Sequence, residues 1–238
     1  MHILDDPLAL SRRARDFLAS AARLDPENPQ HQPTEAMRVR DTRGKLIPTP
    51  FELVLRREGF AHKFGGLRYT VRRSVHMLDA PMVTASQWSF ELGALVRQDS
   101  QGWYFDWYGE HIAVPVFFVQ HTDGRSGVSV GPFLPVHPTA LHVIESHAVM
   151  DFLADWDPWP VSSDAVATAH LLNELPLISE ASGTWQRWRM DAHVAVCEFQ
   201  VWTDDVPRSW GAWIWTSDTS GRRQVEEAAA QAATTQVP

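Results

Sequence analysis

The chain has 238 residues, of which 44% are hydrophobic and 21% are charged, and these proportions are those of a globular protein that folds in water. Its formal net charge is −8, and Cys197 is its single cysteine. One cysteine excludes an internal disulfide and a cysteine-cage metal site, and the longest strongly apolar run, Ile112 to Val119, is too short to span a bilayer. We therefore expect a cytoplasmic protein of one large or two small domains.

The charge is distributed unevenly along the chain. Residues 1–75 carry 14 Lys and Arg against 9 Asp and Glu, whereas residues 76–238 carry 7 against 20. An acidic part repels nucleic acid and attracts a basic protein domain. The other reading is an acidic surface that only keeps the protein in solution.

The first half of the chain predicts two helices followed by strands. A helix is expected over residues 5–24, capped by Asp5 or Asp6, and residues 25–50, with five prolines, are expected to be a linker. The stretch FELVLRREGF, from Phe51, predicts a second helix that ends near Gly59.

The middle of the chain predicts an antiparallel sheet. LRYTVRRSV alternates, with Leu67, Tyr69 and Val71 on one face. Further strands are expected at Trp88–Leu95, Trp103–Tyr108 and Ile112–Val119. The Asp123-Gly124 turn predicts a hairpin between the last of these and GVSV, and Pro115 favours an edge position or a bulge there.

The last third predicts helices over residues 140–154 and Ser163–Leu175, the second of them capped by Ser162 or Ser163. Strands are expected near Trp185–Phe199, extending to Trp202, and at Ala212–Thr216, and the tail after Gly221 is expected to be a short exposed helix or disordered. Six tryptophans supply large apolar faces that need covering: Trp185, Trp188, Trp202, Trp210, Trp213 and Trp215. We therefore expect residues 156–238 to pack on the preceding core.

The stretch ALHVIESHAVMDFL holds several residues that bind metals or move protons elsewhere. They are His142, Glu145, Ser146, His147 and Asp151, with His137 just upstream. Positions five apart on a helix differ by roughly 140°, so His142 and His147 point to different sides and cannot share one ion. The spacing favours an amphipathic helix in which His147, Asp151 and Asp155 form a polar stripe, with His147–Asp151 a weak surface pair. No metal or cofactor is expected.

Gly127-Val128-Ser129-Val130-Gly131 matches G-x-S-x-G, the motif of a nucleophile elbow. Such an elbow requires a strand directly before the serine and a helix directly after it. Here a turn precedes the motif and Pro132 and Pro135 follow it, so a helix is not expected. A hydrolase using Ser129 with Asp151 and His170 is the less favoured alternative.

Three stretches resemble the SUKH (SMI1/KNR4-like) superfamily: LRREGFAHKFGGLRYTV, QWSFELG and DGRSGVSVGPFLPVHPTALHVIESHAVMDFL. In that family a helix leads through a turn of the FGGL type into strands, as Phe64-Gly65-Gly66-Leu67 does here. A hairpin with an Asp-Gly-Arg turn, here Asp123-Gly124-Arg125, and a closing helix follow. The resemblance implies an α+β fold, with a largely antiparallel sheet packed against helices, a helix before it and a tryptophan-rich α/β extension after it.

This resemblance also implies a domain order and a function. Residues 1–48 would form the N-terminal helix and linker, 49–155 the SUKH-like core, and 156–238 an extension packed on that core. Many members are similar to non-catalytic immunity proteins that neutralise bacterial toxins, while others are similar to scaffolds or regulatory adaptors. The first expected contact surface for a basic partner comprises Asp155, Trp156, Asp157 and Trp159, because prolines keep this acidic and aromatic stretch out of a helix. The alternative is that both tryptophans join the core to the C-terminal segment.

Overall fold

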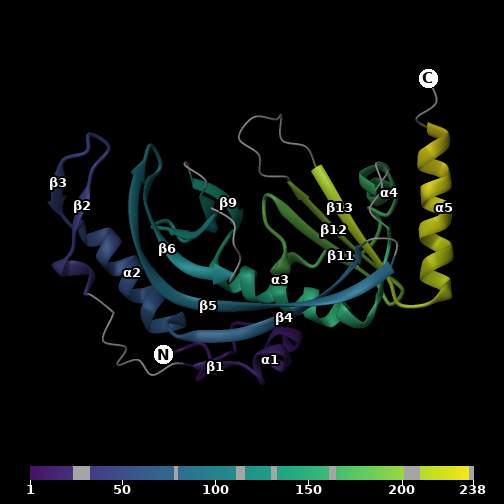
Figure 1. The fold of residues 1–238 in the computed structure, drawn as a ribbon, viewed down its shortest axis with the longest axis horizontal. Coiled ribbons are helices and arrows are strands. Elements are labelled where there is room, and N and C mark those ends of the chain that lie inside the picture. The colour runs from purple at the N-terminus through teal and green to yellow at the C-terminus, as the bar shows by residue number, and fades with distance from the viewer. Residues whose placement is uncertain are drawn as a thin grey trace. The chain divides into compact units, whose positions relative to one another are not determined.

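A computed structural model describes residues 1–23, 33–77, 80–110, 116–129, 133–160, 165–200 and 210–235. The fold is α+β, as predicted: a seven-stranded sheet, a four-stranded sheet and a two-stranded sheet are combined with helices (Figure 1). No helix in the described ranges is long and apolar enough to cross a membrane.

The helices of the described residues are α1 (Arg12–Leu18), α2 (Phe51–Phe64), α3 (Ala140–Phe152), α4 (Ala165–Leu171) and α5 (Thr219–Thr235), with short 3-10 turns η1 (Thr34–Ala36), η2 (Leu153–Asp155) and η3 (Ser179–Ala181). The seven-stranded sheet runs, in spatial order, β1 (Ala22–Arg23), β4 (Leu67–Met77), β5 (Ala80–Asp99), β6 (Gly102–Glu110), β7 (Phe117–His121), β8 (Ser126–Ser129) and β9 (Phe133–His137). The four-stranded sheet runs β10 (Asp157–Pro158), β13 (Trp210–Thr216), β12 (Val194–Gln200) and β11 (Gln186–Met190), and β2 (Arg38–Arg40) pairs with β3 (Leu46–Pro48).

The chain divides into two compact units. Unit 1 comprises Met1–Val71 and Ser86–Val143, and unit 2 comprises Arg72–Ala85 and Ile144–Pro238. The elements β4, β5 and α3 each contribute residues to both units. The boundaries expected from the sequence, at residues 48/49 and 155/156, stay a prediction.

The core of unit 1 is an aromatic cluster under α2. Phe60 of α2 lies 5.6 Å from Phe105 and 6.0 Å from Trp107, ring centre to ring centre. Phe90 stacks on Trp107 at 4.5 Å. The buried residues of α2 recur at positions 53, 57, 60 and 64, the spacing of one helix face. The helix was expected to end near Gly59. It continues to Phe64 instead, because Phe60 and Phe64 are both buried in the core.

The strands of unit 1 follow the sequence pattern. Leu67, Tyr69 and Val71 are all buried, which confirms the predicted face of β4. Asp123-Gly124 lies at the turn of the β7–β8 hairpin, in which Phe118 pairs with Val128, and Gly124 has φ +107°. Residues 111–115, including Pro115, lie outside the described residues.

Unit 2 is built on both faces of its four-stranded sheet. Along β12, Val194 and Val196 pack with α4 and α5, while Ala195 and Cys197 pack with Trp188, Trp215 and the α3 residues Val149 and Leu153. Strand β13 alternates in the same way, with Ala212 and Ile214 on the first face and Trp213 and Trp215 on the second. Successive side chains of a strand point to opposite faces, so both faces are buried and the unit has two cores.

Three expectations about elements were wrong in extent. The helix expected over 5–24 is only α1, capped by the Ser11 hydroxyl, which accepts a hydrogen bond from the Ala14 amide. The expected linker contains η1 and the β2–β3 hairpin. The single strand expected from Trp185 is a hairpin, because the Asp191 carboxylate accepts the amides of His193 and Val194 and turns the chain.

The C-terminal tail also differs from both expected forms. It forms the 17-residue helix α5, whose apolar residues Val225, Ala228 and Ala232 are buried. Their spacing places them on one face, which packs on the core beside α4 and β12. The helix expected over Ser163–Leu175 is observed as α4, which ends earlier than expected, at Leu171, and its expected caps, Ser162 and Ser163, lie outside the described residues.

Candidate functional site

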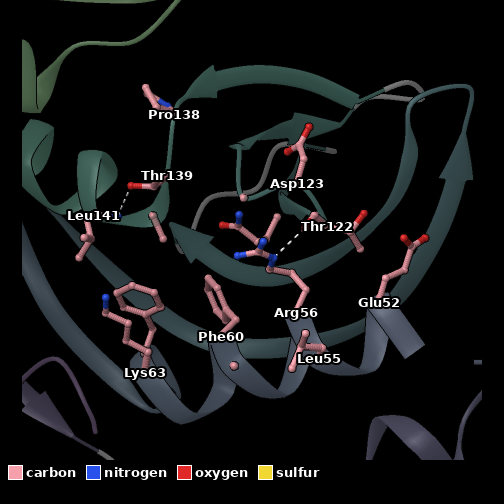
Figure 2. Close-up of a pocket in the computed structure, with 15 residues that line it drawn as sticks. Glu52, Leu55, Arg56, Phe60, Lys63, Thr122, Asp123, Pro138, Thr139 and Leu141 are labelled. Atoms are coloured by element: carbon pink, nitrogen blue, oxygen red, sulfur yellow. Dashed lines mark hydrogen bonds between the residues drawn. The ribbon is translucent and has the colours of Figure 1, made fainter. Parts of the chain in front are cut away.

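A cavity of about 660 Å³ opens in unit 1, and its size is that of a pocket for a small organic molecule. Three segments that are far apart in the sequence line it: one side of α2 over residues 52–64, the β7–β8 turn over 120–124, and the start of α3 over 138–141. Figure 2 shows Lys63 and Leu141 at one end of the cavity and Glu52 at the other, with Phe60 and Arg56 between them.

The cavity wall combines an apolar surface with two cations. The guanidinium of Arg56 donates from Nε to the carbonyl of Thr122 at 2.8 Å (Figure 2). The ammonium of Lys63 lies 5.6 Å from the centre of the Phe64 ring. Within the described residues neither cation forms an ion pair with a carboxylate, although Glu52 and Asp123 also line the cavity.

The carboxylate of Asp123 is held by its neighbours. The guanidinium of Arg125 donates to it at 2.7 Å, the Arg125 amide donates at 2.9 Å, and His121 Nδ1 lies 3.0 Å away. Partial burial alone would raise the pKa of Asp123, but these hydrogen bonds outweigh it and lower the pKa to about 2. Its charge is therefore largely compensated by Arg125 rather than by a cation of the cavity.

The lowered pKa of Asp123 predicts a pH-dependent contribution to stability. The ordinary pKa is 3.8, so the carboxylate stabilises the fold fully above that pH and loses this contribution as the pH falls towards about 2. We expect Asp123→Asn to lower the free energy of unfolding by less than about 1 kcal/mol at neutral pH, because the side chain is partly exposed. The difference from the wild type should vanish near pH 2. Urea unfolding at a series of pH values is the measurement, and an equal difference at pH 2 and pH 7 would contradict the assignment.

The helix that carries the histidines is more buried than an amphipathic surface helix. Glu145, Ser146 and His147 are all buried, so the expected surface pair of His147 with Asp151 is wrong. Asp151 instead binds Arg72, whose amide donates to its carboxylate at 2.8 Å and whose guanidinium lies 3.2 Å away. These hydrogen bonds with Asp151, within unit 2, raise the pKa of Arg72. The expected polar stripe therefore does not include His147, which is buried.

The other residues of that cluster also have structural neighbours. Ser146 accepts a hydrogen bond from the buried Trp188 indole at 2.9 Å, and His142 Nδ1 lies 2.9 Å from the Thr139 hydroxyl. Burial, aided by the charge of His142, lowers the pKa of His137 to about 3, so this imidazole is neutral at physiological pH. Among the described residues no group of three or more His, Cys, Asp or Glu is arranged to hold a metal ion.

Ser129 lies in a sheet rather than on an elbow. It is fully buried at the end of β8, paired with Phe117 on one side and Phe133 on the other. The next described element is strand β9. Asp151 is bound by Arg72, and His170 is exposed with Glu198 at 3.9 Å. Strand β8 thus places the serine differently from the exposed turn before a helix that a nucleophile elbow uses.

The stretch 155–159 follows α3 and forms the edge of the four-stranded sheet. Asp155 and Asp157 are exposed, and Asp155 lies 3.2 Å from Arg72. Trp156 packs partly buried on the core that holds Trp188, whereas Trp159 packs on the opposite core and donates its amide to the Ile214 carbonyl at 2.8 Å. The tryptophans thus lie on opposite faces of the sheet, and the contact role of these four residues stays a prediction.

The sequence patterns did not point to the cavity in unit 1. Its best local signal is Leu55, which lines the cavity and is 65% exposed on α2, where an amphipathic helix normally carries polar residues. The cavity itself requires three segments to meet, which no local pattern shows.

No family model matches the chain, and neither a curated protein nor a solved structure is similar to it at a significant level. The likeness to the SUKH superfamily therefore stays a prediction that depends on the FGGL turn, the Asp-Gly-Arg hairpin and the helix that follows it.

Proposed function

We propose that this protein is a non-catalytic binding protein that captures and neutralises a basic protein partner through unit 2. The observation that carries the proposal is the division of charge between the units. Unit 1 holds 14 Lys and Arg and 14 Asp and Glu, whereas unit 2 holds 7 and 15. The whole net charge of −8 thus belongs to unit 2, and a field of one sign speeds the encounter with a partner of the other sign.

The proposed contact begins at the exposed acids of the sheet edge. Asp157 lies on β10, a two-residue edge strand that pairs only with β13 in the four-stranded sheet. Asp155 lies two residues before it, and Trp156 and Trp159 fix this stretch by packing on the two cores. A rigid stretch loses little conformational entropy on binding, which favours affinity.

The chemical class of the partner follows from the resemblance. The immunity-type SUKH members neutralise toxins that bacteria use against competitors, so a toxin domain is the leading partner. The alternative is a scaffold or regulatory adaptor, for which several unrelated partners are expected. Capture from the native cell, identification by mass spectrometry and co-expression separate the two. A captured protein that stops growth when expressed alone and is harmless with this chain supports neutralisation, and several captured proteins with no such effect support an adaptor.

The charge-led contact makes a quantitative prediction. We expect Asp155→Lys with Asp157→Lys to slow association with the captured partner and to weaken the complex by about tenfold or more. Loss of the Asp155–Arg72 pair should change stability little, because that pair is exposed. Surface plasmon resonance at several salt concentrations is the measurement, and the wild-type association rate should fall as salt screens the charges.

A matched control variant makes the same change in net charge at another place in unit 2. Glu226→Lys with Glu227→Lys, on the exposed side of α5, changes the charge by the same amount. Both variants should associate more slowly, but only the variant at 155 and 157 should dissociate faster. Equal dissociation rates for the two variants would remove the contact surface from the proposal, and an association rate independent of salt would remove the electrostatic account.

A further inference from the structure

We propose that the cavity of unit 1 binds a small organic anion, with the carboxylate or phosphate group at Lys63 and an apolar body against Phe60, Leu55 and Leu141. This site is separate from the protein contact proposed above, because every residue that lines it belongs to unit 1.

The cations select the charge of the ligand. Lys63 and Arg56 lie two turns apart on the same side of α2, and both face the cavity (Figure 2). Of the two acids of the wall, Asp123 is held by Arg125 and His121. Glu52 lies 11 residues before Lys63 on the helix, about 16 Å along its axis. The Lys63 end is therefore positive, and an ion pair formed there is partly shielded from water.

The apolar wall selects the body of the ligand. The Phe60 ring is anchored by the core, since it is 4% exposed and contacts Phe64, Phe90, Phe105 and Trp107. Leu55 is 65% exposed, and Leu141 closes the wall beside Lys63. Large exposed aliphatic side chains beside a concave surface are typical of a binding site rather than of a solvent-facing helix.

The first test compares matched probes by isothermal titration calorimetry. The probes are 1-naphthyl phosphate, 1-naphthylacetate and the neutral 1-naphthaleneethanol, with inorganic phosphate as the anion alone. We expect both naphthyl anions to bind the full chain, and the neutral probe and inorganic phosphate to bind at least about tenfold more weakly. Whichever of the two naphthyl anions binds more tightly shows whether the site prefers a phosphate or a carboxylate group. Equal binding of the neutral probe, or no binding of either naphthyl anion, overturns the proposal.

Substitutions then locate the site. Lys63→Gln should weaken the naphthyl anions by about tenfold and leave the neutral probe unchanged, since it removes only a charge contact. Leu55→Gln, on an exposed side chain, should weaken all naphthyl probes alike. Lys45→Gln, in the β2–β3 turn away from the cavity wall, is the matched control and should change nothing. Equal affinity of the Lys63→Gln and wild-type proteins for the anions overturns the site.

The lysine content offers a second measurement that needs no substitution. Lys45 and Lys63 are the only lysines of the chain, so trace acetylation followed by mass spectrometry reports each of them separately. Saturating 1-naphthyl phosphate should reduce acetylation of Lys63 several-fold and leave Lys45 as it is. Protection of both lysines or of neither contradicts the site.

Discussion

Replacing Trp188 by alanine is expected to lower the free energy of unfolding by about 3–5 kcal/mol. This is the cost of removing a large side chain from a core that cannot collapse to fill the space it leaves. Trp188 is fully buried and stacks on Trp215 at 5.6 Å. Its indole donates to Ser146 at 2.9 Å, and its amide donates to the Ser182 hydroxyl at 2.9 Å. It thus joins β11 to α3, which lies 42 residues earlier in the sequence, and to the nearby turn after η3.

Two milder variants separate packing from hydrogen bonding at Trp188. Trp188→Phe keeps much of the buried ring, and Ser146→Ala leaves the indole N–H without its acceptor, which costs about 1–3 kcal/mol. The double variant should cost less than the two single costs added together, because the same hydrogen bond is lost in each. Urea unfolding followed by far-ultraviolet circular dichroism is the measurement. A loss below about 1 kcal/mol for Trp188→Ala would show that the core of unit 2 is not packed as described.

Replacing Gly109 by alanine should lower the free energy of unfolding by about 2–4 kcal/mol. Gly109 has φ +68°, in the left-handed region, and a Cβ added there would lie 1.9 Å from the Phe118 ring. Movement of that partly buried ring is opposed by its contacts with Trp88 at 4.9 Å and Trp107 at 5.5 Å. The energetic costs of backbone strain and of overpacking therefore add in Gly109→Ala.

Gly44→Ala is the control that separates these two costs. Gly44 has a similar φ, +75°, but an added Cβ would have no atom within 4 Å. Gly44→Ala should therefore lower the free energy of unfolding only by the cost of backbone strain, about 1–2 kcal/mol. Phe118→Leu should recover part of the Gly109→Ala loss by making room. Equal losses of stability for Gly109→Ala and Gly44→Ala would mean that the Phe118 ring does not lie against Gly109 as the structure has it.

The fold was predictable where a local pattern decides it. The alternation of Leu67, Tyr69 and Val71 and the Asp123-Gly124 turn depend on neighbours in the sequence, and the structure confirms both. The pattern failed where tertiary packing decides. Alanines and glutamines after Gly221 look like an exposed tail, yet Val225 and Ala228 supply a narrow apolar face that only the presence of β12 and α4 makes useful.

The candidate sites show the same division. Helical geometry alone correctly separates the directions of His142 and His147, but it cannot show that His147 is buried, because burial depends on what covers the helix. Arg72 lies 79 residues from Asp151 in sequence, so the pair that replaced the expected one has no local signature. Of the six tryptophans of the last third that were expected to need cover, Trp188 and Trp215 find it in Val149 and Leu153 of α3, and Trp202 lies outside the described residues.

The discontinuity of unit 2 sets the order in which the protein is completed during synthesis. Its parts, Arg72–Ala85 and the chain from Ile144, are joined by contacts such as the hydrogen bond from the Trp215 indole to the Ser74 carbonyl, across 141 residues. On the ribosome, unit 1 is fully translated at Val143, whereas Arg72–Ala85 waits for β13 to emerge. At 5–20 residues per second, the 131 residues from Ala85 to Thr216 take roughly 7–26 s. During this interval the early segment is a nascent strand pair without its partners, and it is the stretch of the chain for which we expect chaperone binding to protect the growing polypeptide.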